Sequence, residues 1–175
     1  MDGEIGAQRQ AQIEALLAQA EDRLARDPDL SRAPAIIIDH EGWELAALGA
    51  VAGRLAERYS RPAVLIAHRP GRPSLASARS VKGIDIHEAI ASQGALLIDH
   101  GGHPMAAGFS LRRENVDAVR RGILAWLDSS GATPEATPAL EVDAAIPWSE
   151  VGMALARAME RLAPFGSGNP RPVLA

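Results

Sequence analysis

The sequence predicts an α/β domain with a mixed sheet flanked by helices, preceded by a long connector helix and followed by a second, truncated domain. Short apolar runs rich in β-branched residues alternate with segments of helical periodicity between residues 31 and 127. Residues 128–139, DSSGATPEATPA, are small, polar and proline-bearing, which is typical of a linker. The expected parts are therefore a helix over 1–30, the α/β domain over 31–127, the linker, and the start of another domain over 140–175.

Residues 5–27 predict an amphipathic helix that ends just before Pro28. Its apolar residues recur at helical spacing and share one face: Ile13, Leu16, Leu17, Ala20 and Leu24. Because so long a helix precedes any strand, it is interpreted as a connector to another part of the protein. The alternative is an ordinary packing helix.

Three strands and a helix are expected next. The β-branched run 35–39 predicts a buried strand, and 63–67 and 74–81 predict two more, with a turn over 68–74. Residues 45–59 predict a helix between the first two strands. Its Gly49 and Gly53 lie four residues apart on one face, where they would let another backbone approach closely.

Asp85 is expected to cap a short helix over 86–92. Residues 95–98 are apolar but ambiguous between strand and helix end, 101–108 predict a glycine-rich turn, and 107–111 predict a strand. A helix over 113–127 would turn its apolar side inward through Val116, Val119, Ile123 and Trp126 or Leu127. Beyond the linker, the sequence predicts a strand over 140–146 and a helix capped by Ser149 that carries Val151, Leu155, Met159 and Leu162 on one face.

Composition narrows the function classes. The chain has no cysteine, which excludes disulfides, thiolate zinc sites and cysteine nucleophiles. No apolar run approaches the roughly 20 residues that span a bilayer, and the N-terminus lacks the pattern of a signal peptide. A cytoplasmic location is therefore expected.

The net charge is −4, but the charge is unevenly distributed. Residues 54–82 contain seven basic side chains and one acid, whereas residues 1–30 contain seven acids and three arginines. A basic middle between acidic flanks could bind a phosphate chain, with a solvated surface as the alternative.

Two segments carry candidate binding residues. In Gly101–Gly108, GGHPMAAG, the glycines would expose successive amide N–H groups to an anion, His103 could donate a hydrogen bond to a phosphate oxygen, and the small residues Ala106 and Gly108 would let a ligand backbone approach. In Ser77–Ser80, SARS, Arg79 could form a forked contact with a phosphate.

A metal-dependent hydrolase is the alternative. Asp39–His40, Asp99–His100 and nearby His103 combine carboxylate and imidazole, which suit manganese or zinc. Such a site requires these groups to converge in the fold.

Four segments, in order along the chain, resemble the DHH-associated domain and following oligonucleotide-binding (OB) fold of RecJ-type exonucleases. The signature loop is similar to Gly101–Gly108, and a nucleic-acid-contacting stretch is similar to Ser77–Ser80 with Gly83–Ala89. Gly42–Trp43 with Gly49–Leu55 resembles the domain's first helix, and Leu162–Pro170 resembles the entry to the OB fold.

The resemblance implies a single-stranded nucleic-acid binding module of a 5′→3′ single-strand DNA exonuclease acting in DNA repair and recombination. It implies that phosphates are bound by residues on two segments: Ser77, Arg79, Ser80, Gly101, Gly102, His103, Ala106 and Gly108. Manganese or magnesium is expected in a separate Asp-His-His domain of the same polypeptide, and no catalytic or metal-binding residue is assigned to this chain. Single-stranded DNA, and further a single-strand-binding protein and a helicase, are the expected partners.

The sequence departs from the family in two ways and leaves one further alternative. It contains no Asp-His-His motif, so the family's metal-binding domain is absent from this chain. Family members usually read His-Pro-Gly-Val after the Gly-Trp pair, where this chain has Glu44–Ala47. A fragment of a DHH-family small phosphoesterase is the other reading, since such enzymes share the associated domain. They lack an OB fold, so the segment 162–170 argues against it.

Overall fold

The computed structural model describes residues 2–134, 142–166 and 169–175. It divides the chain into two compact units, Met1–Thr137 and Pro138–Ala175.

A five-stranded mixed sheet forms the centre of the first unit, as expected. In chain order its strands are β1 (Ile36–Glu41), β2 (Ala63–Arg69), β3 (Arg72–Arg79), β4 (Leu97–His103) and β5 (Ala106–Leu111). Their spatial order is β1-β2-β3-β5-β4, with β1 and β2 parallel and the other neighbours antiparallel. The sheet edges are therefore β1 and β4.

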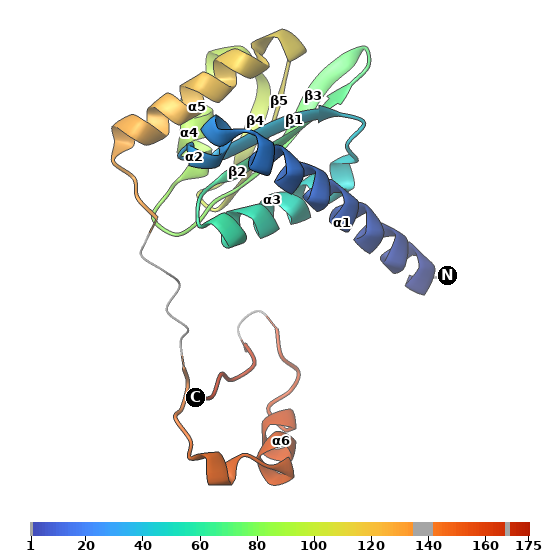
Figure 1. Ribbon diagram of the computed structural model, residues 1–175, viewed down its shortest axis with the longest axis vertical. Helices are drawn as coiled ribbons and strands as arrows, with labels where there is room; N and C mark the ends of the chain where they lie inside the picture. Colours follow the sequence, from blue (N-terminus) through green and yellow to red (C-terminus); the bar gives the residue numbers. More distant parts are fainter. Residues whose placement is uncertain (1, 135–141, 167–168) are drawn as a thin grey trace. The chain divides into compact units, whose positions relative to one another are not determined.

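Two helices pack on each face of this sheet. On one face, α1 (Asp2–Arg26) and α3 (Leu45–Tyr59) pack with β1 and β2 around one apolar cluster. On the other, α4 (Ile86–Ala91) and α5 (Val116–Ser130) pack over a second cluster that reaches β3 and β5 (Figure 1). Asp85 caps α4 by accepting a hydrogen bond from the Glu88 amide, as predicted.

The long N-terminal helix is largely a packing element. The five apolar residues predicted to share its face are all buried, at most 7% exposed, in the cluster that α1 shares with α3. The Trp43 indole also donates a hydrogen bond of 2.9 Å to Gln19 of α1. After α1, Asp27 caps the short helix α2 (Pro28–Arg32). The connecting role remains a prediction for the exposed first turns, residues 6–11.

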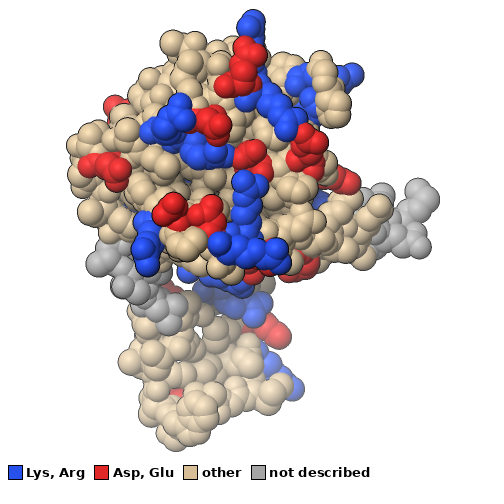
Figure 2. All heavy atoms as spheres, turned by 45° about the horizontal axis from the view of Figure 1, so that its top comes forward, with Lys and Arg blue, Asp and Glu red and all other residues tan. Residues whose placement is uncertain are grey.

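The acidic flank and the basic middle of the sequence pair with each other. Arg54 and Arg58 of α3 bind Glu14 and Glu21 of α1, and Arg61 and Arg69 donate to backbone carbonyls. Figure 2 likewise shows basic and acidic side chains lying beside one another. The charged stretch 54–82 therefore does not form one broad basic surface.

Two predicted turns are shorter than expected because their residues are paired in hairpins. The segment 101–108 is not a glycine-rich turn: β4 runs to His103 and β5 begins at Ala106, so only Pro104 and Met105 lie between the strands. Likewise β2 continues through His68 to Arg69, and β3 begins at Arg72. Glycine inside a strand often marks a close approach of another backbone, as at Gly102, where a Cβ would overlap the Ala106 carbonyl oxygen. The ambiguous segment 95–98 divides between a 3-10 turn, η1 (Gly94–Leu96), and β4.

The end of the first unit and the second unit differ from expectation in detail. A further 3-10 turn, η2 (Arg113–Asn115), precedes α5, which continues to Ser130 and so includes the first three residues of the expected linker. In the second unit, η3 (Trp148–Glu150) precedes α6 (Met153–Glu160), whose N-cap is Gly152 rather than Ser149, because the chain forms the 3-10 turn first.

Part of the strand predicted over 140–146 lies outside the described residues. The rest of it forms only an isolated bridge, from Ala144 to Leu174. None of the helices described is both long and apolar enough to cross a membrane.

Candidate nucleic-acid interface

Most of the predicted binding residues meet on one face of the sheet. Arg79 of β3 pairs with Ala106 of β5, which in turn pairs with His103 of β4. The neighbouring row runs from Ser77 through Gly108 to Gly101. Because directly paired residues point to the same side of a sheet, and residues two apart along a strand do so too, these six share one face. We call them the open face.

The open face is the side of β3, β5 and β4 that α4 and α5 do not cover. The helix α3 packs against β3 on this side, so Ser77 and Arg79 lie beside α3, and β5 and β4 form the uncovered part. Alternate residues of the same strands, among them Ala76, Ala78 and Phe109, are buried in the cluster with α4 and α5. By contrast, Gly101 and His103 are exposed, and Ala106 and Gly108 are half-buried. Adjacent strands lie about 4.8 Å apart, so the backbones at Arg79 and His103, two strands apart, are about 10 Å from each other. Small residues lie between them.

Ser80 and Gly102, also predicted to bind, lie elsewhere. Ser80 is 8% exposed, and its hydroxyl donates a 2.7 Å hydrogen bond to the Ile84 carbonyl, which holds the turn after β3. Gly102 alternates with Gly101 and His103 along β4 and so points to the opposite side. Of the eight residues predicted, six are brought together and two are not.

The glycines of β4 and β5 differ in what the fold requires of them. Gly102 has φ +149°, and a Cβ there would overlap the backbone of Ala106 and Ala107. A Cβ on Gly101 would meet nothing within 4 Å, and one on Gly108 would make an ordinary contact of 3.5 Å with the Ala76 carbonyl oxygen. Only Gly102 is therefore needed by the hairpin, whereas Gly101 keeps the open face flat without a packing reason.

Arg79 lies at the boundary between the open face and α3. Its Nη1 donates to the Ala78 carbonyl at 2.8 Å and to the Ser77 hydroxyl at 3.3 Å. Among the described residues, Arg79 forms no ion pair with a carboxylate, unlike Arg54 and Arg58. The guanidinium, which is half-buried, thus keeps its charge uncompensated beside the open face.

The side chain of Arg79 is also what approaches Gly49 and Gly53 of α3. The sequence suggested that these glycines make room for a backbone, but the nearest atoms are those of Arg79 and Ser77. The expected close approach is confirmed at Gly49, but its partner is a side chain and not a backbone. At Gly53 the expectation is wrong, because a Cβ there would lie at an ordinary 3.9 Å from Arg79 Cγ.

A shallow hollow lies further along the same strands. It has a volume of about 350 Å³ and is lined in part by Leu75, Asp99, Gly101, Gly108 and Ser110. Asp99 places a negative charge at this end, away from Arg79 and His103. The open face is therefore favourable to phosphate at its Arg79–His103 end and less so near Asp99.

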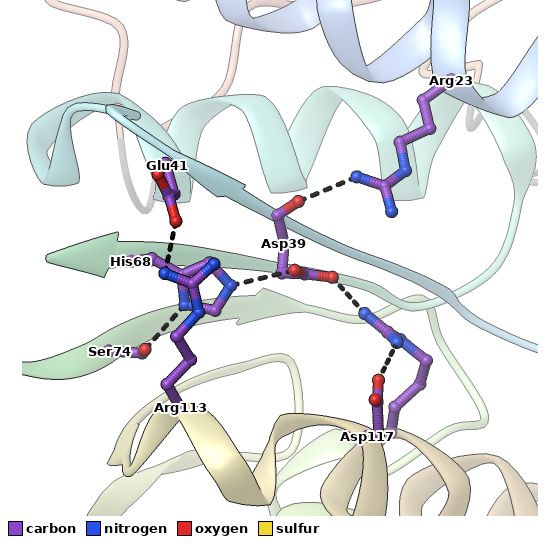
Figure 3. A network of polar contacts seen from close by, with 8 residues as sticks. Arg23, Asp39, Glu41, His68, Ser74, Arg113 and Asp117 are labelled. Carbon is purple, nitrogen blue, oxygen red and sulfur yellow. Dashed lines mark hydrogen bonds and ion pairs between the residues drawn. The ribbon is translucent and has the colours of Figure 1, made fainter.

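A network of polar side chains lies on the opposite side of the sheet (Figure 3). Asp39 of β1 contacts His68 Nε2 at 2.9 Å and forms an ion pair with Arg120 of α5. His68 Nδ1 lies 2.8 Å from the Ser74 hydroxyl, and Arg23 of α1 donates to the Asp39 carbonyl at 3.0 Å. The network joins α1, α5 and three strands.

The order Ser74–His68–Asp39 is that of a hydrolase triad, but its burial prevents such chemistry. Ser74 is 1% exposed and His68 is 6% exposed, so no substrate can reach the hydroxyl. The group serves as a buried hydrogen-bonded link between strands. Burial acts to raise the pKa of Asp39, but the hydrogen bond from His68 and the charges of Arg120 and Arg23 outweigh it, so this pKa lies below its ordinary value.

The metal-hydrolase alternative is wrong for the residues proposed. Asp39 and His40 belong to β1, whereas Asp99 and His100 belong to β4, and these strands are the two opposite edges of the sheet. Asp39 is already occupied by His68 and Arg120, and no group of three metal-ligating side chains converges within the described residues. The two Asp-His pairs look alike in sequence but never meet.

Sequence reasoning missed the buried network and the contact between Gly49 and the side chain of Arg79. A histidine closing the apolar run Ala63–Ala67 is a signal for a buried polar partner, since a lone imidazole in a core requires hydrogen bonds. Nothing in the sequence identified Arg120 as the partner of Asp39, because the two are 81 residues apart.

Two protein-family models match this chain, one in each of its two units. The family model of the DHHA1 domain matches residues 32–129, and that of the RecJ OB domain matches residues 142–175. The single-stranded-DNA-specific exonuclease RecJ of Bacillus subtilis strain 168 is 32% identical over 139 residues, covering 79% of this chain and 18% of that protein.

Solved structures show the same relationship. RecJ of Thermus thermophilus in complex with Mn²⁺ aligns over 97% of this chain and 24% of its own, with a TM-score of 0.77 and 28% identity. Its complex with Mg²⁺ gives a TM-score of 0.75 at the same identity and covers 26% of that chain. The chain thus spans about a fifth to a quarter of the length of these relatives.

Proposed function

This chain belongs to the DHHA1 domain family and corresponds to the C-terminal part of RecJ, and on this premise we propose that its open face binds the phosphate backbone of single-stranded DNA. We further propose that the whole protein is a 5′→3′ single-strand DNA exonuclease that acts in DNA repair and recombination in the cytoplasm. The match of residues 142–175 to the RecJ OB domain favours this over a small phosphoesterase.

One observation supports the proposal above others: the sheet register aligns Arg79, Ala106 and His103 in one row beside Ser77, Gly108 and Gly101. A guanidinium and an imidazole flank a floor of small residues, Ala106, Gly108 and Gly101, and the fold does not require glycine at position 101. A phosphodiester chain can lie close to such a floor, and the flanking groups donate hydrogen bonds to it. The open face has no Phe, Tyr or Trp, so base stacking would contribute little.

The chemistry of hydrolysis is assigned to another part of the protein. Mn²⁺ or Mg²⁺ would be held by an Asp-His-His domain of the same polypeptide, and the open face would hold the strand. The residues described here provide no metal cluster of their own. A single-strand-binding protein and a helicase are proposed as further partners on the family resemblance alone.

Replacing Arg79 by Ala tests the proposal. We expect about tenfold weaker binding of unrelated single-stranded oligonucleotides, because a charge-assisted contact to phosphate carries no sequence information. Fluorescence anisotropy at low salt measures the affinity. Arg72→Ala is the matched control, since it removes the same charge from an exposed position on the same strand. Equal loss in both variants, or none in Arg79→Ala, would contradict the assignment.

A further inference from the structure

We propose that Gly49 is a positioning residue that sets where the Arg79 guanidinium lies on the open face. The inference deepens the proposed function and rests on it. It concerns a residue of α3 that does not itself reach the open face but bounds the space in which the arginine lies.

The evidence is the space above Gly49. A Cβ at this position would stand 2.8 Å from Arg79 Nη2, 3.3 Å from the Ser77 hydroxyl oxygen and 3.4 Å from Arg79 Cζ. All three atoms belong to side chains of β3, and two belong to the guanidinium itself. The missing side chain of Gly49 is thus the space that the end of Arg79 occupies.

The guanidinium is fixed from its other side by β3. Nη1 donates to the Ala78 carbonyl at 2.8 Å and to Ser77 at 3.3 Å, while Nη2 lies over Gly49. An alanine at position 49 would come too close to Nη2, and the flexible end of Arg79 is what can move. Its charge would remain, but its position relative to the small-residue floor would change.

Folding alone does not call for glycine at this position. Glycine inside a helix is less favourable than alanine, and the atoms that a Cβ would meet can swing away without moving any backbone. Gly49→Ala is therefore expected to fold at least as stably as the wild type while binding DNA less well. A residue with only a structural role would show the opposite order of effects.

Gly53 provides the matched control one helical turn further on. A Cβ there would lie 3.9 Å from Arg79 Cγ, which is an ordinary van der Waals distance. Gly53→Ala thus makes the same chemical change in the same helix, above the stem of the same arginine, without displacing the guanidinium.

The test is a double-mutant cycle on the 175-residue chain, with a fluorescein-labelled oligodeoxythymidine as probe. Gly49→Ala should weaken binding about as much as Arg79→Ala, roughly tenfold, and Gly53→Ala should bind as the wild type does. In the Arg79→Ala background, Gly49→Ala should have no further effect, because the group that it displaces is gone. Thermal melts monitored by circular dichroism should show no loss of stability in either glycine variant.

The outcomes separate this inference from the function that it rests on. Wild-type affinity in Gly49→Ala together with weak binding in Arg79→Ala would overturn the positioning role and leave the proposed function intact. Equal weakening by Gly49→Ala and Gly53→Ala, or additive effects of Gly49→Ala and Arg79→Ala, would also overturn it. Wild-type affinity in Arg79→Ala would contradict the proposed function itself.

If Gly49→Ala lowered the melting temperature, affinities would be compared at a temperature at which circular dichroism shows every variant to be folded. Weaker binding by folded Gly49→Ala, with no further weakening in the Arg79→Ala background, would support the positioning role. Wild-type affinity of folded Gly49→Ala would overturn it.

Discussion

Gly101 and Gly102 are neighbours on β4, but they have opposite reasons for lacking a side chain. A Cβ fits freely at position 101 and would overlap the β5 backbone at position 102. The sequence has glycine at both positions, and only the structure of the hairpin shows that the fold requires glycine at 102 and not at 101. This distinction allows the proposed DNA binding of the open face to be tested separately from the stability of the fold.

The two glycines lead to a paired prediction. Gly101→Ala should leave the free energy of unfolding unchanged or raise it by about 0.5–1 kcal/mol, while weakening binding of single-stranded DNA. Gly102→Ala should destabilise the chain by about 2 kcal/mol or more, because of its positive φ and its backbone overlap. Urea unfolding and anisotropy measure the two quantities. Unchanged DNA affinity in Gly101→Ala would count against a backbone passing over this position.

Asp39 gives a prediction about pH. Its pKa is lowered in the folded state, with burial opposing the effect of His68, Arg120 and Arg23. A lowered pKa contributes stability that is fully present above the unfolded value of about 3.9 and is lost as pH falls through the folded value. Unfolding free energy should therefore decline as the pH falls from about 5 to 3.

The comparison variant is Asp39→Asn. It should be less stable than the wild type at pH 7 by about 2 kcal/mol, because Arg120 and His68 lose a charged acceptor, and its stability should depend less on pH in the acidic range. Other carboxylates with lowered pKa, such as Glu14 and Glu41, are present in both proteins and cancel in the difference. Identical acid dependence in the two proteins would show that Asp39 is not the group responsible.

At the scale of elements, α1 shows what helical periodicity can predict and what it cannot. The spacing of its apolar residues identified the buried face correctly, since all five are in the core. The same pattern says nothing about the partner, which is α3. The acidic residues of α1 are explained by that partner too, because Glu14 and Glu21 meet Arg54 and Arg58.

Leu17→Ala tests the packing of α1. Removing a buried leucine should cost about 2–5 kcal/mol of unfolding free energy, although the helix lies at the start of the chain. Gln8→Ala, in the exposed part of the same helix, should cost less than about 0.5 kcal/mol. Chemical denaturation compares them. If Leu17→Ala were as stable as Gln8→Ala, α1 would act only as a connector that detaches from the domain.

The limits of prediction also follow from particular elements. Strand and helix positions in the first unit could be anticipated, because alternation and helical periodicity are local. The hairpin of 101–108 was mistaken for a turn, because glycine normally marks turns and only pairing with β5 makes β4 a strand. The two Asp-His pairs have the same residue pattern, which suggested one metal site, whereas the strand order places them on opposite edges of the sheet. Long-range pairing, which no local pattern encodes, accounts for each of these errors.

For the molecule as a whole, the pairing of arginines with other groups of the chain predicts that DNA affinity depends only weakly on salt. The net charge is −4, and most arginines of residues 54–82 are bound to carboxylates or carbonyls. If Arg79 and one neighbour neutralise about two phosphates, the slope of log affinity against log salt should be about −1.4. Anisotropy titrations at several salt concentrations measure it. A slope steeper than about −4 would indicate an extended basic surface that the charge pairing argues against.

The most direct measurement of the central claim is the position of the DNA on the sheet. An NMR titration of the isotope-labelled chain with oligodeoxythymidine follows every backbone amide at once. The open face predicts the largest shift changes at Ser77, Arg79, Gly101, His103, Ala106 and Gly108, with α5 and the Asp39 network unaffected. Changes confined to α5, to β1 or to the second unit, with these six amides unmoved, would contradict the account.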